Sequence, residues 1–252
     1  MAGYSIFGST DIDYLLGEDL PIGSSYLLES ESGTQESAFV AGFLDAGFRQ
    51  QELCIIATSD MPHQELIKRL PHHLNTEEKI NSGSLLVLDL WTEVAGDPEF
   101  AKPIWTTNHP RDINAAKRLI YELAHLIPDR IRDANLKGIR YVTNSLSSMI
   151  MNYGFQPTYR WMDRGLNLAR RSSVTSLALL DSRMFDETVV ASFEHLHDGV
   201  VRLCMRQLGD RFQSSIRIKK STIPMFSTMM VPYDIVDMRP HLQKQPDNYG
   251  QN

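Results

Sequence analysis

The chain has 252 residues, of which 42% are apolar and 22% are charged, as in an ordinary globular protein. Its formal net charge of −6 argues against a dedicated nucleic-acid-binding protein, although a local basic patch is compatible with it. Cys54 and Cys204 form no CxxC pair, and no apolar run reaches about 18 residues. We therefore expect a cytoplasmic protein with no structural zinc, no signal peptide and no membrane span.

The N-terminal part of the chain predicts a strand, a loop and a helix in succession. A short amphipathic helix is expected over 12–20, and an apolar strand over 26–28. Small and polar residues then fill 30–37, and a helix is expected over 37–46, ending at Gly47. A strand followed by a small-residue loop and a helix is the layout of a phosphate-binding P-loop.

This loop departs from P-loop chemistry at its defining positions. The P-loop pattern is glycine, four residues, glycine, lysine, and serine or threonine. A P-loop lysine neutralises phosphate charge, whereas Glu36 would repel a triphosphate by about 4 kcal/mol at ~4 Å and an effective dielectric of ~20. The loop is therefore either a degenerate nucleotide site or an ordinary strand-to-helix connection. Its degenerate nucleotide-site positions are Ser30, Gly33, Thr34, Gln35, Glu36 and Ser37.

Apolar runs alternate with amphipathic helices along the next part of the chain. This alternation predicts an α/β fold whose mostly parallel central sheet is flanked by helices on both faces. The expected strands are 53–57, 84–90, 138–142 and 174–180, and the expected helices are 62–70, 113–127, 156–171 and 186–196. Late segments are expected to form antiparallel strands over 200–204, 215–219 and 233–236.

Two polar segments interrupt this pattern. Residues 91–111 contain three prolines and predict a long loop that is functional or mobile. Residues 240–252 lack an apolar face, and we expect them to be disordered. Because no repeat or linker divides the rest, the sequence predicts a single domain over 1–239 and a tail over 240–252.

Several short stretches have an order and spacing that resemble a known family. They are residues 12–17 and 20–24 before the loop, 46–56 at the second strand, Asn144-Ser145-Leu146-Ser147, and Glu194-His195-Leu196 with Asp198-Gly199-Val200. Together they resemble the KaiC-like branch of the RecA superfamily, a group of archaeal recombinase-related ATPases. The resemblance covers roughly residues 10–238. It implies a RecA-like P-loop fold whose copies assemble side by side.

The resemblance also implies which site residues have been replaced. In the family the P-loop lysine falls at Glu36, the Walker B aspartate that helps to hold Mg²⁺ falls at Asn144, and the paired glutamates fall at Ser59 and Asp60. Ser37 keeps the type of the P-loop metal ligand, and Lys220 aligns loosely with a lysine that reaches a neighbouring subunit's nucleotide. Phosphoryl transfer depends on positioning and charge stabilisation. These losses predict a pseudo-ATPase in which ATP hydrolysis is absent or very weak, with no metal and no cofactor; bound ATP with magnesium is the disfavoured alternative.

Other residues carry weaker signals of a site. Asp60, Asp89 and Asn144 follow strands and should face one crevice, because the carboxyl ends of parallel strands line the ligand crevice of an open sheet. His195 and His197 are two apart on a helix and diverge, so we interpret them as a helix end and not a metal pair.

Two surfaces could contact a partner. Arg160 and Arg164 share one helix face, which is either a DNA or partner surface or simply solvated. Met225 and Phe226 lie in a methionine-rich segment that either contacts another chain or belongs to the core.

Three functions compete at this point. The first is a non-catalytic regulatory or scaffold protein that contacts other proteins or copies of itself. The second is an accessory recombination factor that binds DNA beside an active recombinase, and would bind more weakly as salt rises. The third is an ATP-binding protein with a weak or relocated catalytic apparatus.

Overall fold

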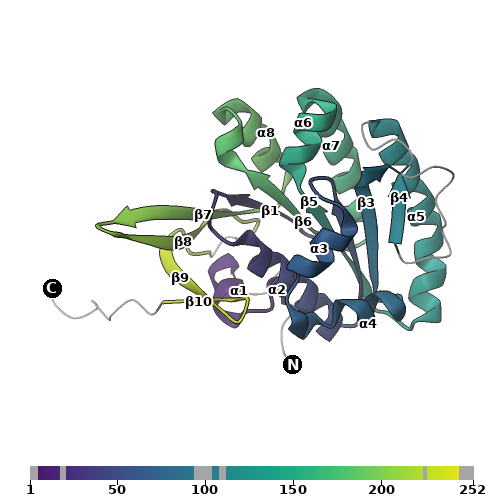
Figure 1. Ribbon diagram of the computed structural model, residues 1–252, viewed down its shortest axis with the longest axis horizontal. Helices are drawn as coiled ribbons and strands as arrows, with labels where there is room; N and C mark the ends of the chain where they lie inside the picture. The colour runs from purple at the N-terminus through teal and green to yellow at the C-terminus, as the bar shows by residue number, and fades with distance from the viewer. Residues whose placement is uncertain (1–4, 18–20, 94–103, 108–111, 224–225, 244–252) are drawn as a thin grey trace.

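The fold is organised around one sheet, which contains ten strands within the part of the chain that the structure describes. The structure, a computed structural model, describes residues 5–17, 21–93, 104–107, 112–223 and 226–243. The strand order is β10-β9-β8-β7-β1-β6-β5-β2-β3-β4 (Figure 1). The strands are β1 (Ser25–Ser30), β2 (Glu52–Thr58), β3 (Leu85–Glu93), β4 (Ile104–Thr107), β5 (Gly138–Asn144), β6 (Val174–Asp181), β7 (Gly199–Leu208), β8 (Arg211–Lys220), β9 (Val231–Val236) and β10 (Arg239–Leu242).

The sheet is parallel from β4 to β7 and antiparallel from β7 to β10. The predicted mostly parallel sheet with late antiparallel strands is confirmed. The central strands β1 and β2 are buried along their whole length, because helices cover both faces. The β7–β8 hairpin extends beyond the body of the molecule (Figure 1).

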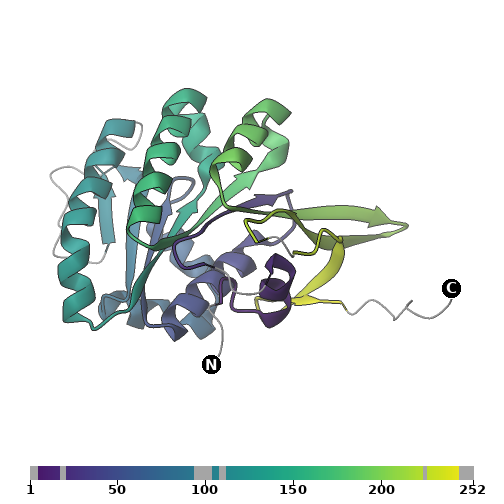
Figure 2. The ribbon, with the colours of Figure 1, turned by 180° about the vertical axis from the view of Figure 1, so that it is seen from behind.

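The helices form two layers, one on each face of the sheet (Figures 1 and 2). The first layer contains α1 (Thr10–Leu16), α2 (Glu36–Arg49), α3 (His63–Arg69) and α4 (Thr76–Asn81). The second contains α5 (Ile113–Asp133), α6 (Leu146–Tyr153), α7 (Phe155–Arg171) and α8 (Glu187–Leu196). Short 3₁₀ turns lie at His72–Leu74 and Ser182–Met184. The apolar core is correspondingly split, with α1 to α4 packed on one side of the sheet and α5 to α8 on the other.

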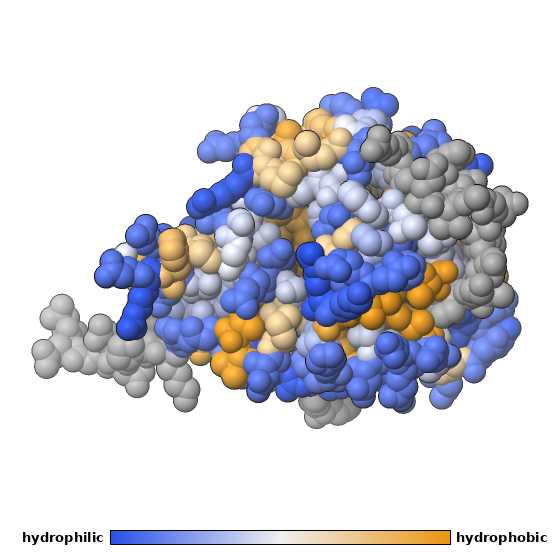
Figure 3. Space-filling model, viewed as in Figure 1, coloured by the Kyte–Doolittle hydropathy of each residue, from blue (hydrophilic) through white to orange (hydrophobic). Residues whose placement is uncertain are grey.

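The front surface is mostly polar and carries separate apolar patches (Figure 3). No helix among the described residues has the length and apolar character that a membrane crossing would require.

Gly47 does not end its helix, contrary to the prediction. Helix α2 continues through Gly47 to Arg49. A Cβ atom at Gly47 would lie 2.7 Å from Arg140 Cδ and 2.7 Å from Cys54 Sγ. The glycine is therefore required for close packing of the helix on the sheet and not for a turn.

Two predicted irregular segments contain strands. Part of the predicted loop over 91–111 is β4, in which Trp105 is fully buried, and 94–103 and 108–111 lie outside the described residues. The predicted tail begins inside β10, which pairs with β9 and packs on α1 and α2. Pro240 is buried there, and 244–252 lie outside the described residues.

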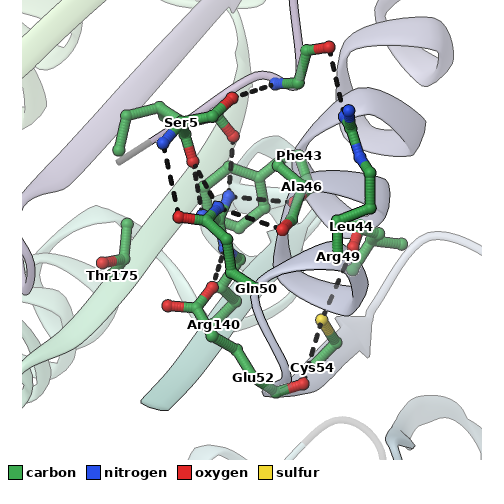
Figure 4. Close-up of polar contacts among 12 residues, drawn as sticks. Ser5, Phe43, Leu44, Ala46, Arg49, Gln50, Glu52, Cys54, Arg140 and Thr175 are labelled. Carbon is green, nitrogen blue, oxygen red and sulfur yellow. Dashed lines mark hydrogen bonds and ion pairs between the residues drawn. The ribbon is translucent and has the colours of Figure 1, made fainter. Parts of the chain in front are cut away.

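A buried arginine joins the N-terminal segment to the sheet (Figure 4). Arg140 on β5 is fully buried and forms an ion pair with Glu52 at the start of β2. Its guanidinium also donates to the carbonyls of Ile6 (2.7 Å), Phe43 (3.0 Å) and Ser5 (2.5 Å). A buried charge is tolerated only when it is paired and hydrogen-bonded in this way.

Candidate functional site

The loop between β1 and α2 contains two residues with positive φ just before the helix begins. Gln35, which we expected at the position of the final glycine of the P-loop pattern, has φ 55° and ψ 47°, the left-handed conformation that glycine adopts without strain. A non-glycine residue there costs about 1–2 kcal/mol. Gly33 also has a positive φ of 91°. Gln35 thus adopts, at this cost, a backbone conformation that favours glycine.

The loop is closed on itself and braced by two distant strands. The backbone N–H and the hydroxyl of Thr34 both donate to the Glu31 carbonyl, at 3.1 and 2.8 Å. Tyr233 on β9 donates its hydroxyl to the Thr34 carbonyl at 2.6 Å. Met205 on β7 covers Gly33, since a Cβ on that glycine would lie 2.7 Å from Met205 Cε. The Thr34 N–H is therefore already bonded within the loop, and Tyr233 and Met205 hold the loop against the sheet.

Glu31 adds a second carboxylate to the loop. Its Oε2 accepts from Arg183 Nη2 at 2.8 Å and from the Met205 backbone N–H at 3.2 Å. Arg202 Nη2 lies 3.9 Å from Glu31 Oε1. A carboxylate of the protein therefore occupies donors that would otherwise be available to an anion.

Glu36 is the first residue of α2, where an acidic side chain interacts favourably with the positive end of the helix dipole. In a nucleotide-binding protein the phosphate fills that electrostatic role. Ser37 follows it in the first turn and is partly buried. Glu36 thus places a negative charge at the start of the helix, and Ser37 provides a hydroxyl group in the same turn.

The structure brings Ser59, Asp60 and Asn144 together at the ends of β2 and β5. Asn144 Nδ2 donates to Asp60 Oδ1 at 3.2 Å, and the Thr58 hydroxyl lies 3.2 Å from the same oxygen. Ser59 donates its hydroxyl to the Ser145 carbonyl at 2.8 Å. Burial raises the pKa of Asp60 above its ordinary value, despite the opposing hydrogen bond from Thr58. The cluster is held by its own hydrogen bonds at the ends of the two paired strands.

Asp89 does not join this cluster. It is fully buried in the middle of β3, which continues past the predicted strand end to Glu93, and it accepts from the His63 backbone N–H at 2.9 Å and the Thr92 hydroxyl at 2.7 Å. Burial opposes its charge, but hydrogen bonds from His63 and Thr92 outweigh burial and lower its pKa. Asp89 therefore fixes the start of α3.

A charged cluster beneath the loop was not predicted. Glu29 on β1 is fully buried, 3.3 Å from Lys219 Nζ and 4.0 Å from Arg202 Nε. Lys219 also forms an ion pair with Glu194 on α8. Burial and then Glu194 raise the pKa of Glu29 to about 7, against the opposing effect of Lys219. The sequence signal for this cluster was Glu29, a glutamate inside an apolar strand.

A basic cavity of about 460 Å³ lies beside this cluster. Its cationic lining residues are Arg183, Arg202, Arg206, Arg217 and Lys219. Three of them, Arg183, Arg202 and Lys219, already lie within 4.0 Å of Glu29 or Glu31. Arg206 and Arg217 are exposed at its edge.

The remaining predicted residues lie away from the loop. Lys220 Nζ donates to the carbonyls of Glu194 (3.1 Å), His195 (3.2 Å) and His197 (2.5 Å), so it caps the C-terminus of α8 in its own chain. His197 is buried and His195 lies in the last turn of α8, as predicted for a helix end.

The two predicted contact surfaces differ in exposure. Arg160 and Arg164 are exposed on α7. Phe226 is partly buried against the core on the α2 side, whereas Met225 lies outside the described residues. Within the described ranges, no group of three or more His, Cys, Asp or Glu side chains is placed to hold a metal ion.

Comparisons with known proteins place this geometry in a family. The sequence model of the family described as "ATPase: KaiC" matches residues 8–240. A search of curated proteins found no significant match. The crystal structure of a KaiC-like protein from the hyperthermophilic archaeon Pyrococcus horikoshii OT3 superposes with a TM-score of 0.73 at 17% identity, covering 94% of this chain and 97% of that chain. Since 516 chains of solved structures match, the fold is widely shared and does not decide function.

Proposed function

The chain belongs to the KaiC family of ATPases, and we propose that it is a member that does not hydrolyse ATP and acts as a regulatory or scaffold protein through contacts with other proteins. The observation that carries the proposal is the loop between β1 and α2, where Glu36 begins the helix and Glu31 is held by Arg183 and by the Met205 N–H, so that two carboxylates lie where a triphosphate would have to bind.

Three features of the site support loss of hydrolysis. The loop presents Glu31 and Glu36 where phosphate charge would have to be neutralised. Asn144 and Asp60 are hydrogen-bonded to each other, and an amide lacks the negative charge that attracts Mg²⁺. Ser59 is buried with its hydroxyl on a backbone carbonyl, so it is not placed to activate water. Each loss removes a separate contribution to phosphoryl transfer.

The β7–β8 hairpin supports a role in protein contact. At its tip Leu208 is 57% exposed and Phe212 is 68% exposed. Exposed apolar side chains on a projecting hairpin are typical of contact sites. The partner is another protein or a second copy of this chain.

Steady-state ATP hydrolysis by the purified protein tests the catalytic half of the proposal. We expect no turnover above background, and no difference between the wild type and Ser37→Ala. Hydrolysis at the rate of an active family member that disappears in Ser37→Ala would contradict the proposal.

A variant of the β7–β8 hairpin tests the proposed contact with another protein. The double variant Leu208→Ser with Phe212→Ser should lose a partner, or a self-association, that the wild type shows in pull-down from the native host and in sedimentation. Tyr121→Ser removes an aromatic ring of similar exposure on α5 and should leave the interaction unchanged. Identical partners for all three proteins would refute the hairpin as the contact.

The basic cavity favours a second candidate, an ATP-binding protein whose anion site has moved. Arg206 and Arg217 at its edge form no ion pair with a described residue. If this candidate were right, Arg217→Ala would weaken nucleotide binding and Glu36→Gln would not affect it.

A further inference from the structure

The second face of the sheet carries a cavity that the proposed function does not use. It has a volume of about 540 Å³ and lies between α5 and α7, over β2, β5 and β6. Figure 2 shows the two helices side by side on this face, on the opposite side of the sheet from α2. The volume falls in the range of about 300–1,000 Å³ that small-molecule sites occupy.

The wall that the described residues form around the cavity is mostly apolar and carries no charge. Leu123 and Ile127 contribute from α5, Trp161 and Leu166 from α7, and Ile55 from β2. No Asp, Glu, Lys or Arg side chain of the described residues lines it. A charged ligand would lose its hydration there without gaining a counter-ion, so the lining selects an uncharged molecule.

Two buried polar atoms on this wall have no hydrogen-bond partner. Ser176 is 5% exposed and His197 is 1% exposed, and both line the cavity. Ser176 Oγ and His197 Nε2 form no hydrogen bond within the described structure. Unpartnered polar atoms are costly when buried, and a bound ligand would satisfy them.

The two atoms lie toward one end of the cavity. Ser176 pairs with Ser25 on β1, and the backbone N–H of Asp198 donates to the Ser25 carbonyl at 2.9 Å. Ser176 and His197 are therefore both adjacent to the start of β1.

The histidine offers an acceptor and not a donor. Its Nδ1 lies 2.8 Å from the Phe193 carbonyl, which can only accept, so Nδ1 carries the hydrogen. Burial lowers the pKa of His197 to about 4, so the ring is neutral near pH 7 and Nε2 has a free lone pair. The cavity thus presents an acceptor on His197 and a hydroxyl on Ser176.

We propose that this cavity binds an uncharged, mostly apolar small molecule whose polar group, such as a hydroxyl, donates a hydrogen bond to His197 Nε2 and accepts one from Ser176 Oγ. A helix of a partner protein fits less well, because its backbone N–H groups are bonded within the helix and cannot reach the histidine.

Three probes that share the naphthalene ring test the proposal with the full chain. 2-Naphthol is uncharged and donates a hydrogen bond, 2-methylnaphthalene has no donor, and 2-naphthoate is charged. By titration calorimetry or fluorescence we expect saturable binding of 2-naphthol, about tenfold weaker binding of 2-methylnaphthalene, and no binding of 2-naphthoate.

Variants of the cavity locate the binding. Gly165 lines the cavity, and a Cβ built on it meets nothing within 4 Å, so Gly165→Phe should fill the space and abolish binding. Asn167→Phe puts the same ring on an exposed position of α7 and should bind 2-naphthol as the wild type does. Ser176→Ala should reduce the difference in binding affinity between 2-naphthol and 2-methylnaphthalene. This variant still tests the proposal if Gly165→Phe does not fold.

Several results would overturn the proposal. They are no saturable binding of 2-naphthol, equal binding of 2-naphthoate, or binding that Gly165→Phe and Ser176→Ala both leave unchanged. A dimer that Gly165→Phe dissociates, without any 2-naphthol binding by the wild type, would assign the cavity to a second copy of the chain instead.

Discussion

Glu36 places a fixed negative charge at the start of a 14-residue helix. Backbone N–H groups there make a positive pole that a phosphate or a carboxylate can satisfy. The P-loop lysine of the family acts in the opposite sense, by attracting the phosphate. Under the proposed alignment with that lysine, Glu36 both removes the attraction for a nucleotide and supplies the helix with an anion of its own.

Replacing Glu36 with lysine should weaken the fold without creating an enzyme. We expect Glu36→Lys to lower the free energy of unfolding by about 0.3–1 kcal/mol, because a cation replaces an anion at the positive pole of the helix dipole. Urea unfolding measures this change, with Glu36→Gln as an intermediate control. ATP hydrolysis in Glu36→Lys would show that Asn144 and Ser59 are not limiting.

The buried Glu29 predicts how stability depends on pH. Its pKa rises from 4.5 to about 7 on folding, so the folded state holds this proton more tightly than the unfolded state does. The stabilisation of the folded state by this proton on Glu29 is fully present below about pH 4.5 and is lost as the pH rises through about 7. Glu29→Gln imitates the protonated carboxyl, so its stability relative to the wild type should improve by about 1–3 kcal/mol between about pH 5 and pH 8.

Glu194 provides the opposite control. Lys219 and Glu29 hold its pKa below the ordinary value, although burial opposes this. Its contribution is present above about pH 4.5 and is lost as the pH falls through its folded pKa. In urea unfolding, Glu194→Gln should lose stability relative to the wild type at the higher pH. A Glu29→Gln difference that did not change with pH would argue against a buried, proton-binding Glu29.

At the scale of elements, two helical glycines have opposite surroundings. Gly47 in α2 lies against Arg140 and Cys54, whereas Gly165 in α7 faces open space. A glycine inside a helix is destabilising relative to alanine unless close packing requires it. The same substitution should therefore act in opposite directions on the two layers of the molecule.

We expect Gly47→Ala to lower the free energy of unfolding by about 1–3 kcal/mol, because the new methyl group overlaps buried atoms. Gly165→Ala should raise it by about 0.4–1 kcal/mol through reduced entropy of the unfolded chain. Chemical denaturation of both variants checks the pair. Equal effects would mean that α2 is not packed on the sheet as closely as described.

The sequence predicted most elements because their patterns are local. The buried strand over 53–57 and the helix over 156–171 follow directly from apolar runs and helical spacing, and both are confirmed within β2 and α7. The strand β4 was missed because its four residues show no period of their own and are recognised only through pairing with β3. Gly47 was misread because its neighbours come from strands later in the chain.

At the scale of the whole molecule, the candidate site depends on contacts between distant segments. The sequence located the loop, and it placed Asp60 and Asn144 together from the strand ends, but it wrongly added Asp89 to that group. It did not reveal that Met205 and Tyr233 brace the loop or that Arg183 holds Glu31, because these partners are about 150 to 200 residues away in the chain. The two candidate sites lie on opposite faces of the sheet. The loop between β1 and α2 lies on the α2 side, and the apolar cavity lies beneath α5 and α7.

Titration calorimetry of the full chain with ATP and Mg²⁺ tests the loss of the nucleotide site most directly. We predict no heat of binding beyond dilution for the wild type, and the same result for Ser37→Ala. Saturable binding with a micromolar Kd that Ser37→Ala abolishes would contradict that loss, because it would place a magnesium-bound triphosphate over the start of α2.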